Sequence, residues 1–268
     1  MVSKVFVVVF FFCGTAGAIC PPYHPNLILC WDTQEGFGTI TKDNSRSALH
    51  GTLTNGPAWT FAPTVKAIAG STNTSVDMGD KTLSFSATPT VEVVSAATSL
   101  FDFSNNLPYV IAFSFQRAAT LSANQVILSH TDGSTGVGWA IYMETDGHWV
   151  VAHVGAANSS AGGKIQDINP HRFLVARDVG NLYVYIDGKI FFKEVGHADM
   201  SSSANQPFGL AHMSVSAAGA WGGKAGNVAI WNFFPGPNQS QVDVFAWNDY
   251  VHQQGSGSVS TTTDGGVR

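Results

Sequence analysis

Two carboxylates that lie two residues apart are the strongest hint of catalysis in this sequence. Glu144 and Asp146 flank Thr145, and side chains two apart on a strand face the same way, about 6.6 Å from each other. Inverting glycosidases place their acid and base at a similar separation. Asp146, however, precedes Gly147 in a pattern that is typical of a turn. The pair therefore favours a structural role over catalysis.

The nine histidines invite a metal interpretation, but their spacing argues against zinc. His148 and His153 are five residues apart on one predicted strand, so their side chains point to opposite faces. Four others are isolated in the sequence: His130, His171, His197 and His212. None shows the paired ligand spacing of a zinc site. We expect surface or turn histidines.

The elements that would position these groups are strands, and the clearest lie between Phe173 and Val195. Phe173 to Arg177 and Leu182 to Ile186 are β-prone, and Asp187-Gly188 supplies the positive φ angles of a two-residue hairpin loop before Ile190 to Val195. Both faces of the hairpin carry apolar side chains, so we expect it inside a sandwich and not at its rim. The predicted register pairs Ile186 with Lys189, Val184 with Phe191, and Leu182 with Lys193.

Many further short runs alternate like strands. They are 26–32, 109–116, 125–129, 138–144, 148–154, 207–215 and 226–233, and the strongest alternation, over 109–116, predicts a central strand. One helix is expected near the end, with Ser240 as its cap, Asp243 three residues on, and an apolar face of Val242, Phe245 and Ala246. The fold class is all-β: a two-sheet antiparallel β-sandwich with one short C-terminal helix.

The run Leu182-Tyr183-Val184-Tyr185-Ile186-Asp187-Gly188-Lys189 resembles the hairpin of the laminin-G-like and concanavalin A-like jelly rolls. Further blocks follow in the order of that family: Gly51-Thr52-Leu53, Leu83-Ser84-Phe85, Val91-Glu92-Val93 and Leu100-Phe101-Asp102-Phe103. The resemblance covers roughly Leu27 to Val251 and implies a concanavalin A-like jelly roll. This fold hosts lectins, adhesion modules, hydrolases, lyases and virion proteins, so it does not fix a function.

The resemblance also bears on chemistry. Glycoside hydrolases of this fold carry a Glu-x-Asp-x-x-Glu strand and its lyases a basic strand with Arg, His and Tyr; this chain contains neither pattern. We therefore expect no enzyme. Members of the fold often hold one calcium ion on oxygen ligands from the first strands and the last core strand. The corresponding residues are Asp32 and Asn227, and the family usually has Asp at the second position.

Composition excludes some classes of partner. With 13 Lys and Arg scattered over 268 residues and a net charge of -5, the chain lacks the clustered basic footprint of a nucleic-acid binder. Its low charge content and many small residues fit an extracellular or virion protein. The length suits one sandwich domain.

The N-terminus predicts secretion. Lys4 precedes an apolar run, and Ala16-Gly17-Ala18 matches a cleavage site, so 1–18 is interpreted as a signal peptide; a buried first strand is the alternative. The run is shorter than the roughly 20 residues that span a bilayer. In an oxidising compartment Cys20 and Cys30 would form a disulfide, whereas in a cytoplasm they would stay buried thiols. The sandwich domain would occupy 19–254, followed by a flexible Gly/Ser/Thr tail over 255–268.

Aromatic residues suggest where a ligand would bind. Trp221 lies in a Gly-rich segment, and an indole face stacks well on a sugar ring. Trp139 follows a loop whose Asp132, Ser134 and Thr135 could hydrogen-bond to hydroxyls. Both tryptophans could instead fill the core, to which Trp149, Trp231 and Trp247 are assigned.

The sequence thus supports three hypotheses. The first is a secreted or surface-exposed, non-catalytic binding module that recognises a glycan or glycosylated surface. The second is a virion or cell-surface structural or attachment protein, a decoration or receptor-binding subunit whose partners are other copies or surface proteins. A glycoside hydrolase or polysaccharide lyase ranks last. Three glycosylation sequons, at Asn73, Asn158 and Asn238, are about as many as chance gives.

Overall fold

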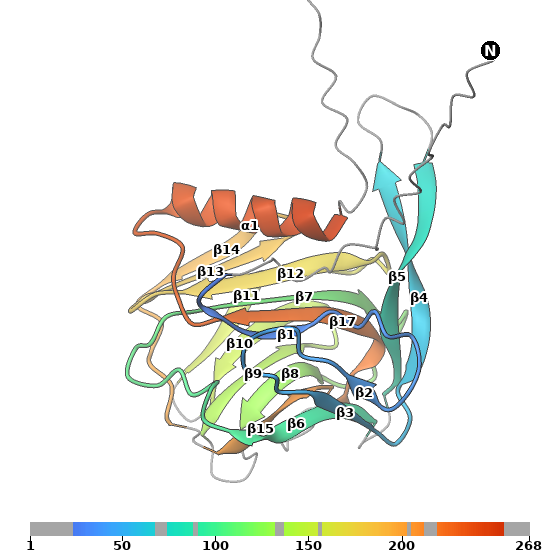
Figure 1. Ribbon diagram of the computed structural model, residues 1–268. Coiled ribbons are helices and arrows are strands. Elements are labelled where there is room, and N and C mark those ends of the chain that lie inside the picture. The colour runs from blue at the N-terminus through green and yellow to red at the C-terminus, as the bar shows by residue number, and fades with distance from the viewer. Residues whose placement is uncertain are drawn as a thin grey trace, which may run out of the picture.

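A computed structural model shows that the chain folds as two antiparallel sheets packed face to face (Figure 1). The structure describes residues 24–67, 74–87, 91–131, 137–154, 157–202, 205–211 and 219–254. The predicted signal peptide, Cys20, the predicted tail and the loop of Asp132, Ser134 and Thr135 lie outside these residues. The prediction of an all-β sandwich is confirmed.

The eight-stranded sheet has the order β14-β13-β12-β7-β17-β5-β4, and β1 pairs with β17 beside this path. The predicted central strand is confirmed as β7, which lies between β12 and β17. The strands are β1 (Leu27–Trp31), β4 (Ala58–Ala67), β5 (Thr74–Ser86), β7 (Tyr109–Arg117), β12 (His171–Arg177), β13 (Asn181–Ile186), β14 (Lys189–Val195) and β17 (Gly222–Trp231).

The nine-stranded sheet has the order β11-β10-β9-β8-β15-β6-β3-β2, and β16 pairs with β8. Its β8–β9–β10 meander matches the prediction from sequence. The strands are β2 (Ile40–Thr41), β3 (Gly51–Thr54), β6 (Glu92–Thr98), β8 (Gln125–Thr131), β9 (Gly138–Met143), β10 (His148–His153), β11 (Ala157–Lys164), β15 (Gln206–Leu210) and β16 (Gly219–Ala220).

The β13–β14 hairpin differs from the prediction in two respects. Its first pair, Ile186 with Lys189, is as predicted, but a bulge then pairs Val184 with Phe192 and shifts the rest of the register by one residue. In addition, β14 is the edge strand of its sheet, so the hairpin lies at the rim. Both faces of β13 are nonetheless buried, because one faces the core between the sheets and the other faces the helix.

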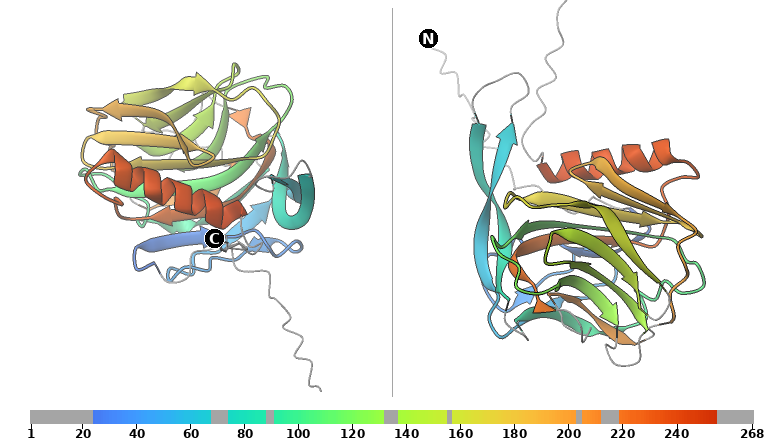
Figure 2. Two further views of the ribbon diagram at one scale, coloured as in Figure 1. Left: turned by 90° about the horizontal axis from the view of Figure 1, so that it is seen from above. Right: turned by 180° about the vertical axis from the view of Figure 1, so that it is seen from behind.

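Helix α1 (Gln239–Gln254) lies across the outer face of the eight-stranded sheet (Figures 1 and 2). Asn238 caps it, because its Oδ1 accepts the backbone N–H of Gln241 at 3.1 Å; the predicted cap, Ser240, is the second helical residue. Val242 and Ala246 are buried in a second apolar cluster with Trp231, and Phe245 packs against it. The eight-stranded sheet is thus covered on both faces.

The β4–β5 hairpin was not expected from the sequence at this length. Its ten- and thirteen-residue strands extend past the body of the sandwich, near the C-terminal end of α1 (Figure 2). Within this hairpin only Leu83-Ser84-Phe85 was singled out from the sequence, as a block of the family resemblance, and this block lies in the part of β5 that pairs with β17 inside the sheet.

Candidate functional site

The two tryptophans predicted to bind a ligand are buried, which corrects the prediction. Trp221 is 0% exposed and its indole packs at 6.3 Å from the rings of both Phe115 and Trp149. Trp139 is buried as well, and its Nε1 donates to the carbonyl of Phe101 at 2.9 Å. A glycine-rich segment thus carries Trp221 into the core, where its large apolar surface is removed from water. Neither indole offers a face to a ligand.

The two predicted calcium ligands have different partners: Asp32 directly follows β1, and Asn227 lies in β17. The Asp32 carboxylate accepts hydrogen bonds from Asn44 Nδ2 at 2.8 Å and from the backbone of Gln34 at 3.2 Å. Burial raises the pKa of Asp32. The Oδ1 of Asn227 instead accepts a hydrogen bond from the hydroxyl of Thr33 at 3.1 Å. Both candidate ligands are therefore already engaged by protein groups.

The guanidinium of Arg172 lies next to β17, the strand of Asn227. The backbone oxygen of Asn227, in the β17 bulge, accepts a hydrogen bond from Arg172 Nη1 at 2.6 Å. The same guanidinium holds both carboxylate oxygens of Asp249 in α1, at 2.8 and 3.0 Å. Both side chains are buried. This bidentate pair therefore joins the helix to the eight-stranded sheet.

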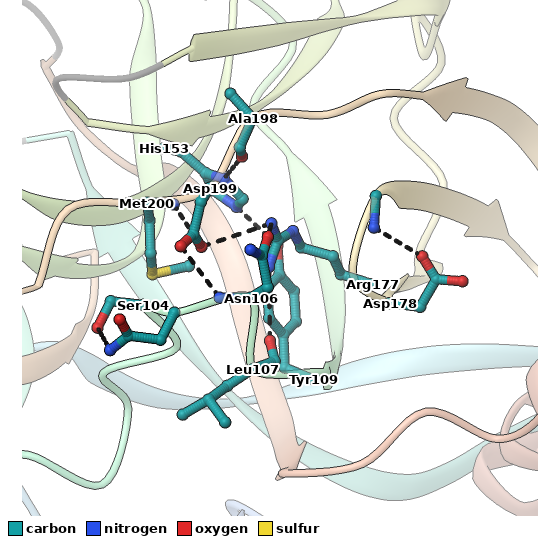
Figure 3. Close-up of polar contacts among 12 residues, drawn as sticks. Ser104, Asn106, Leu107, Tyr109, His153, Arg177, Asp178, Ala198, Asp199 and Met200 are labelled. Atoms are coloured by element: carbon teal, nitrogen blue, oxygen red, sulfur yellow. Dashed lines mark hydrogen bonds and ion pairs between the residues drawn. The ribbon is translucent and has the colours of Figure 1, made fainter.

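A second buried arginine, Arg177, lies at the end of β12 in a polar cluster (Figure 3). Its Nη2 donates to Asn106 Oδ1 at 3.2 Å and lies 3.6 Å from Asp199 Oδ1. Among the described residues, no group hydrogen-bonds to its Nε. Asp199 in turn accepts the backbone N–H groups of Asn106 and Met200. The cluster fastens two loops to the sheet.

His153 lies in the same cluster and is held neutral. Its Nδ1 donates to the carbonyl of Ala198 at 2.7 Å, so its Nε2 accepts the hydroxyl of Tyr109 at 3.1 Å (Figure 3). Burial, together with the neighbouring His197, lowers the pKa of His153 to about 3. The ring of His197 stands edge-on to it at 4.1 Å, and burial lowers the pKa of that imidazole too. The expectation of surface or turn histidines is wrong for these two and for buried His130.

These histidines predict a loss of stability in acid. Their folded pKa values lie below the unfolded value of 6.5, so above that pH both states are neutral and contribute no difference. As the pH falls below 6.5 the unfolded chain takes up protons that the folded chain does not, and stability falls. Between pH 6 and 4 the free energy of unfolding of a His153→Gln variant should fall by about 1.4 kcal/mol less per pH unit than that of the wild type. Urea unfolding at each pH measures the two slopes. Equal slopes would contradict the buried neutral imidazole.

The carboxylate pair at the β9–β10 turn contacts Lys164 and His148. Asp146 Oδ2 lies 2.8 Å from Lys164 Nζ and 2.9 Å from His148 Nδ1, and Glu144 approaches the same imidazole at 3.9 Å. The hydrogen bond from Lys164 is the main cause that lowers the pKa of Asp146 to about 2. Glu144, Asp146 and His148 could between them offer three metal-ligand atoms, but Lys164 occupies the position of a cation.

Removing that lysine should restore the ordinary acidity of Asp146. In Lys164→Met the carboxyl loses its principal hydrogen-bond donor, so we expect its pKa to rise from about 2 towards the usual 3.8. NMR titration of the carboxyl carbon measures this shift. The exposed Lys42→Met variant, which leaves the turn intact, serves as the control; an unchanged Asp146 pKa in Lys164→Met would refute the ion pair.

Exposed aromatic and acidic side chains meet where α1 crosses the β13–β14 turn. Trp247, which was assigned to the core, is 51% exposed, and its ring lies 5.7 Å from that of Tyr250. Both side chains pack on Gly188 of the turn. Next to it, His171 bridges Asp187 at 2.8 Å and Asp167 at 2.9 Å. We call Asp167, His171, Asp187, Trp247 and Tyr250 the helix–hairpin patch.

The imidazole of His171 fixes the two carboxylates of this patch. Burial disfavours its charged form, but the hydrogen bonds with Asp187 and Asp167 outweigh burial and raise its pKa above the ordinary value. Both ring nitrogens donate when the ring is an imidazolium, which suits two acceptors. The patch was missed from sequence; the features that could have indicated it are the Asp187-Gly188 turn and the Trp-x-x-Tyr spacing of Trp247 and Tyr250 in the helix.

No family model matches the chain. No curated protein matches it either. No helix in the described part of the chain is long and apolar enough to cross a membrane.

Solved structures share the fold at low sequence identity. The binding domain of Paraclostridial Mosquitocidal Protein 1 is 13% identical over 82% of this chain, and the binding domain of botulinum neurotoxin serotype G is 15% identical over 83%, each with a TM-score of 0.57. Trypanosoma rangeli sialidase in complex with sialic acid is 11% identical over 86%, with a TM-score of 0.57. The chain spans 52%, 51% and 34% of these three proteins. At such identities the likeness shows the fold, a two-sheet β-sandwich.

Proposed function

We propose that this chain is a secreted or surface-exposed, non-catalytic binding module that recognises a glycan or a glycosylated surface. Two of the similar structures are named as toxin binding domains, which supports a binding role for the sandwich. The order of the sequence blocks supports a place among the laminin-G-like and concanavalin A-like jelly rolls. Fold alone does not assign function, which depends on the side chains that the fold presents.

The absence of catalysis is proposed from the contacts and pKa values of the titratable groups. The pair that most resembles a catalytic acid and base, Glu144 and Asp146, contacts Lys164 and His148, and the pKa of Asp146 is held near 2. A general acid must hold a proton near neutral pH, which this carboxylate cannot do. His153 is buried with a pKa of about 3 and hydrogen-bonds to a backbone carbonyl instead of a carboxylate. A triad needs that carboxylate to orient its base.

Secretion, the Cys20–Cys30 disulfide and one calcium ion are further parts of the proposal. Cys30 is buried in β1, and its proposed partner Cys20 precedes it by ten residues in the sequence. Asp32 and Asn227 supply oxygen atoms of the type that calcium prefers. Binding there would require Asp32 to exchange Asn44, and Asn227 to exchange Thr33, for the ion.

The test is a glycan array with the chain from Ile19 to Arg268, run with and without calcium. We expect saturable binding to a subset of glycans, and mass spectrometry of each bound glycan should show it intact after incubation. Cleaved glycans would make the chain a hydrolase or lyase. Failure to bind any glycan, together with self-assembly on size-exclusion chromatography, would instead favour the structural or attachment protein.

A further inference from the structure

Trp247 is an exposed tryptophan on a rigid support. Its indole is 51% exposed, while Tyr250 packs beside it with ring planes 39° apart. A β-carbon placed on Gly188 would lie 3.1 Å from both side chains, so the turn backbone directly underlies the two rings. Burial, followed by the charge of Asp187, raises the pKa of Tyr250, which keeps its hydroxyl protonated at neutral pH. The helix and the hairpin together hold the rings in place.

The polar side of the patch is equally ordered. Asp187 Oδ1 accepts the backbone N–H of Arg172 at 2.8 Å, and its Oδ2 contacts His171 at 2.8 Å. Asp167 Oδ1 contacts the other nitrogen of the same ring at 2.9 Å. Asp187 is about one-third exposed and Asp167 about half. Each carboxylate therefore keeps lone pairs that can accept hydrogen bonds from solvent or from a ligand.

An exposed indole beside two ordered carboxylates suits a pyranose ring. The apolar C–H face of a pyranose ring stacks on an exposed indole, and its hydroxyl groups donate to fixed carboxylates. Two carboxylates beside a single imidazole, which carries at most one positive charge, disfavour an anionic sugar and favour a neutral or amino-substituted one. A basic cluster, which an anionic membrane surface would require, is not part of the patch.

We propose that the helix–hairpin patch is the glycan-binding site and that it takes a neutral or amino-substituted pyranose, with Trp247 as the stacking residue and Asp187 as a hydroxyl or ammonium acceptor. The inference rests on the proposed function, whose site it names. Trp247 replaces Trp221, since the latter is enclosed by the core.

The experiment compares the wild type with Trp247→Ala, Trp247→Gln and the control Phe37→Ala on the same array, followed by calorimetry with the best neutral or amino-sugar ligand. Phe37 is 78% exposed in the β1–β2 loop and lies outside the patch. We expect both Trp247 variants to keep the wild-type circular dichroism spectrum. Their affinity for the glycan should fall by about tenfold or more. Phe37→Ala should bind like the wild type.

The possible outcomes distinguish failure of the proposed site from failure of the proposed glycan-binding function. Glycan binding that survives in both Trp247 variants would overturn the site and leave the binding module intact. Wild-type preference for sialylated over neutral and amino-substituted glycans would overturn the ligand class. An array without any binding would remove the proposed function itself. Trp247-dependent association with phosphatidylcholine vesicles, without glycan binding, would make the patch a membrane contact and overturn the proposal.

Discussion

Replacing Asp249 with alanine is expected to lower the free energy of unfolding by about 3–5 kcal/mol. The change removes both oxygens that hold the Arg172 guanidinium and leaves a buried charge without its partner. Alanine favours the helical backbone more than aspartate does, so the loss cannot come from helix propensity. Urea unfolding followed by circular dichroism measures the difference. A loss below about 1 kcal/mol would show that the pair does not hold α1 on the sheet.

The matched control removes both charges. In the double variant Arg172→Met, Asp249→Leu neither charge of this pair remains, and apolar side chains take its place. Such replacements are often neutral or stabilising, so the double variant should recover most of the stability lost in Asp249→Ala. If it is no more stable than the single variant, the loss must come from the packing of α1 and not from the unpaired arginine.

The second large effect is expected at Trp221. Truncation to alanine removes an indole that is fully enclosed by Phe115 and Trp149 and leaves a cavity between the sheets. We expect a loss of about 3–5 kcal/mol in urea unfolding. Trp247→Ala is the comparison, because a surface substitution usually changes stability by less than about 0.5 kcal/mol. Equal losses at the two positions would contradict the burial that the structure assigns to them.

This contrast also matters for reading binding data. A binding defect in Trp221→Ala would reflect a damaged core, because its indole cannot reach a ligand. A defect in Trp247→Ala would report the loss of a contact at the surface. Stability and affinity must therefore be measured on the same variants before either tryptophan is placed in a binding site.

Much of the fold could be predicted because strand patterning is local. The alternation over 109–116 identified the central strand β7, and Asp187-Gly188 located a hairpin turn correctly. The register beyond Tyr185 could not be predicted, since the bulge depends on how β14 meets its neighbours. The edge position of β14 depends in the same way on sheet order, which a local pattern does not contain.

The exposure of single aromatic side chains was much harder to predict. Glycines around Trp221 suggested an open loop, yet Gly222 and Gly223 begin β17 and carry the indole inward. Trp247 follows buried Ala246 in the helix, but it lies just outside the face that contacts the sheet. Exposure at both positions is decided by the docking of elements far apart in the chain.

The buried histidines were missed for a similar reason. His153 and His197 are 44 residues apart, and only the closing of the sandwich brings their rings to 4.1 Å. The hydrogen bond between His171 and Asp187 also joins two elements, because His171 lies in β12 and Asp187 lies in the turn after β13. Spacing along the sequence reveals ligand pairs on one element, whereas these contacts are made between elements.

Binding of the wild-type chain to a glycan array at neutral pH is the most direct test of the central claim that the sandwich is a glycan-binding module. We expect saturable binding to glycans that end in neutral or amino-substituted pyranoses, and recovery of those glycans intact. The absence of binding to every glycan, with and without calcium, would contradict that claim.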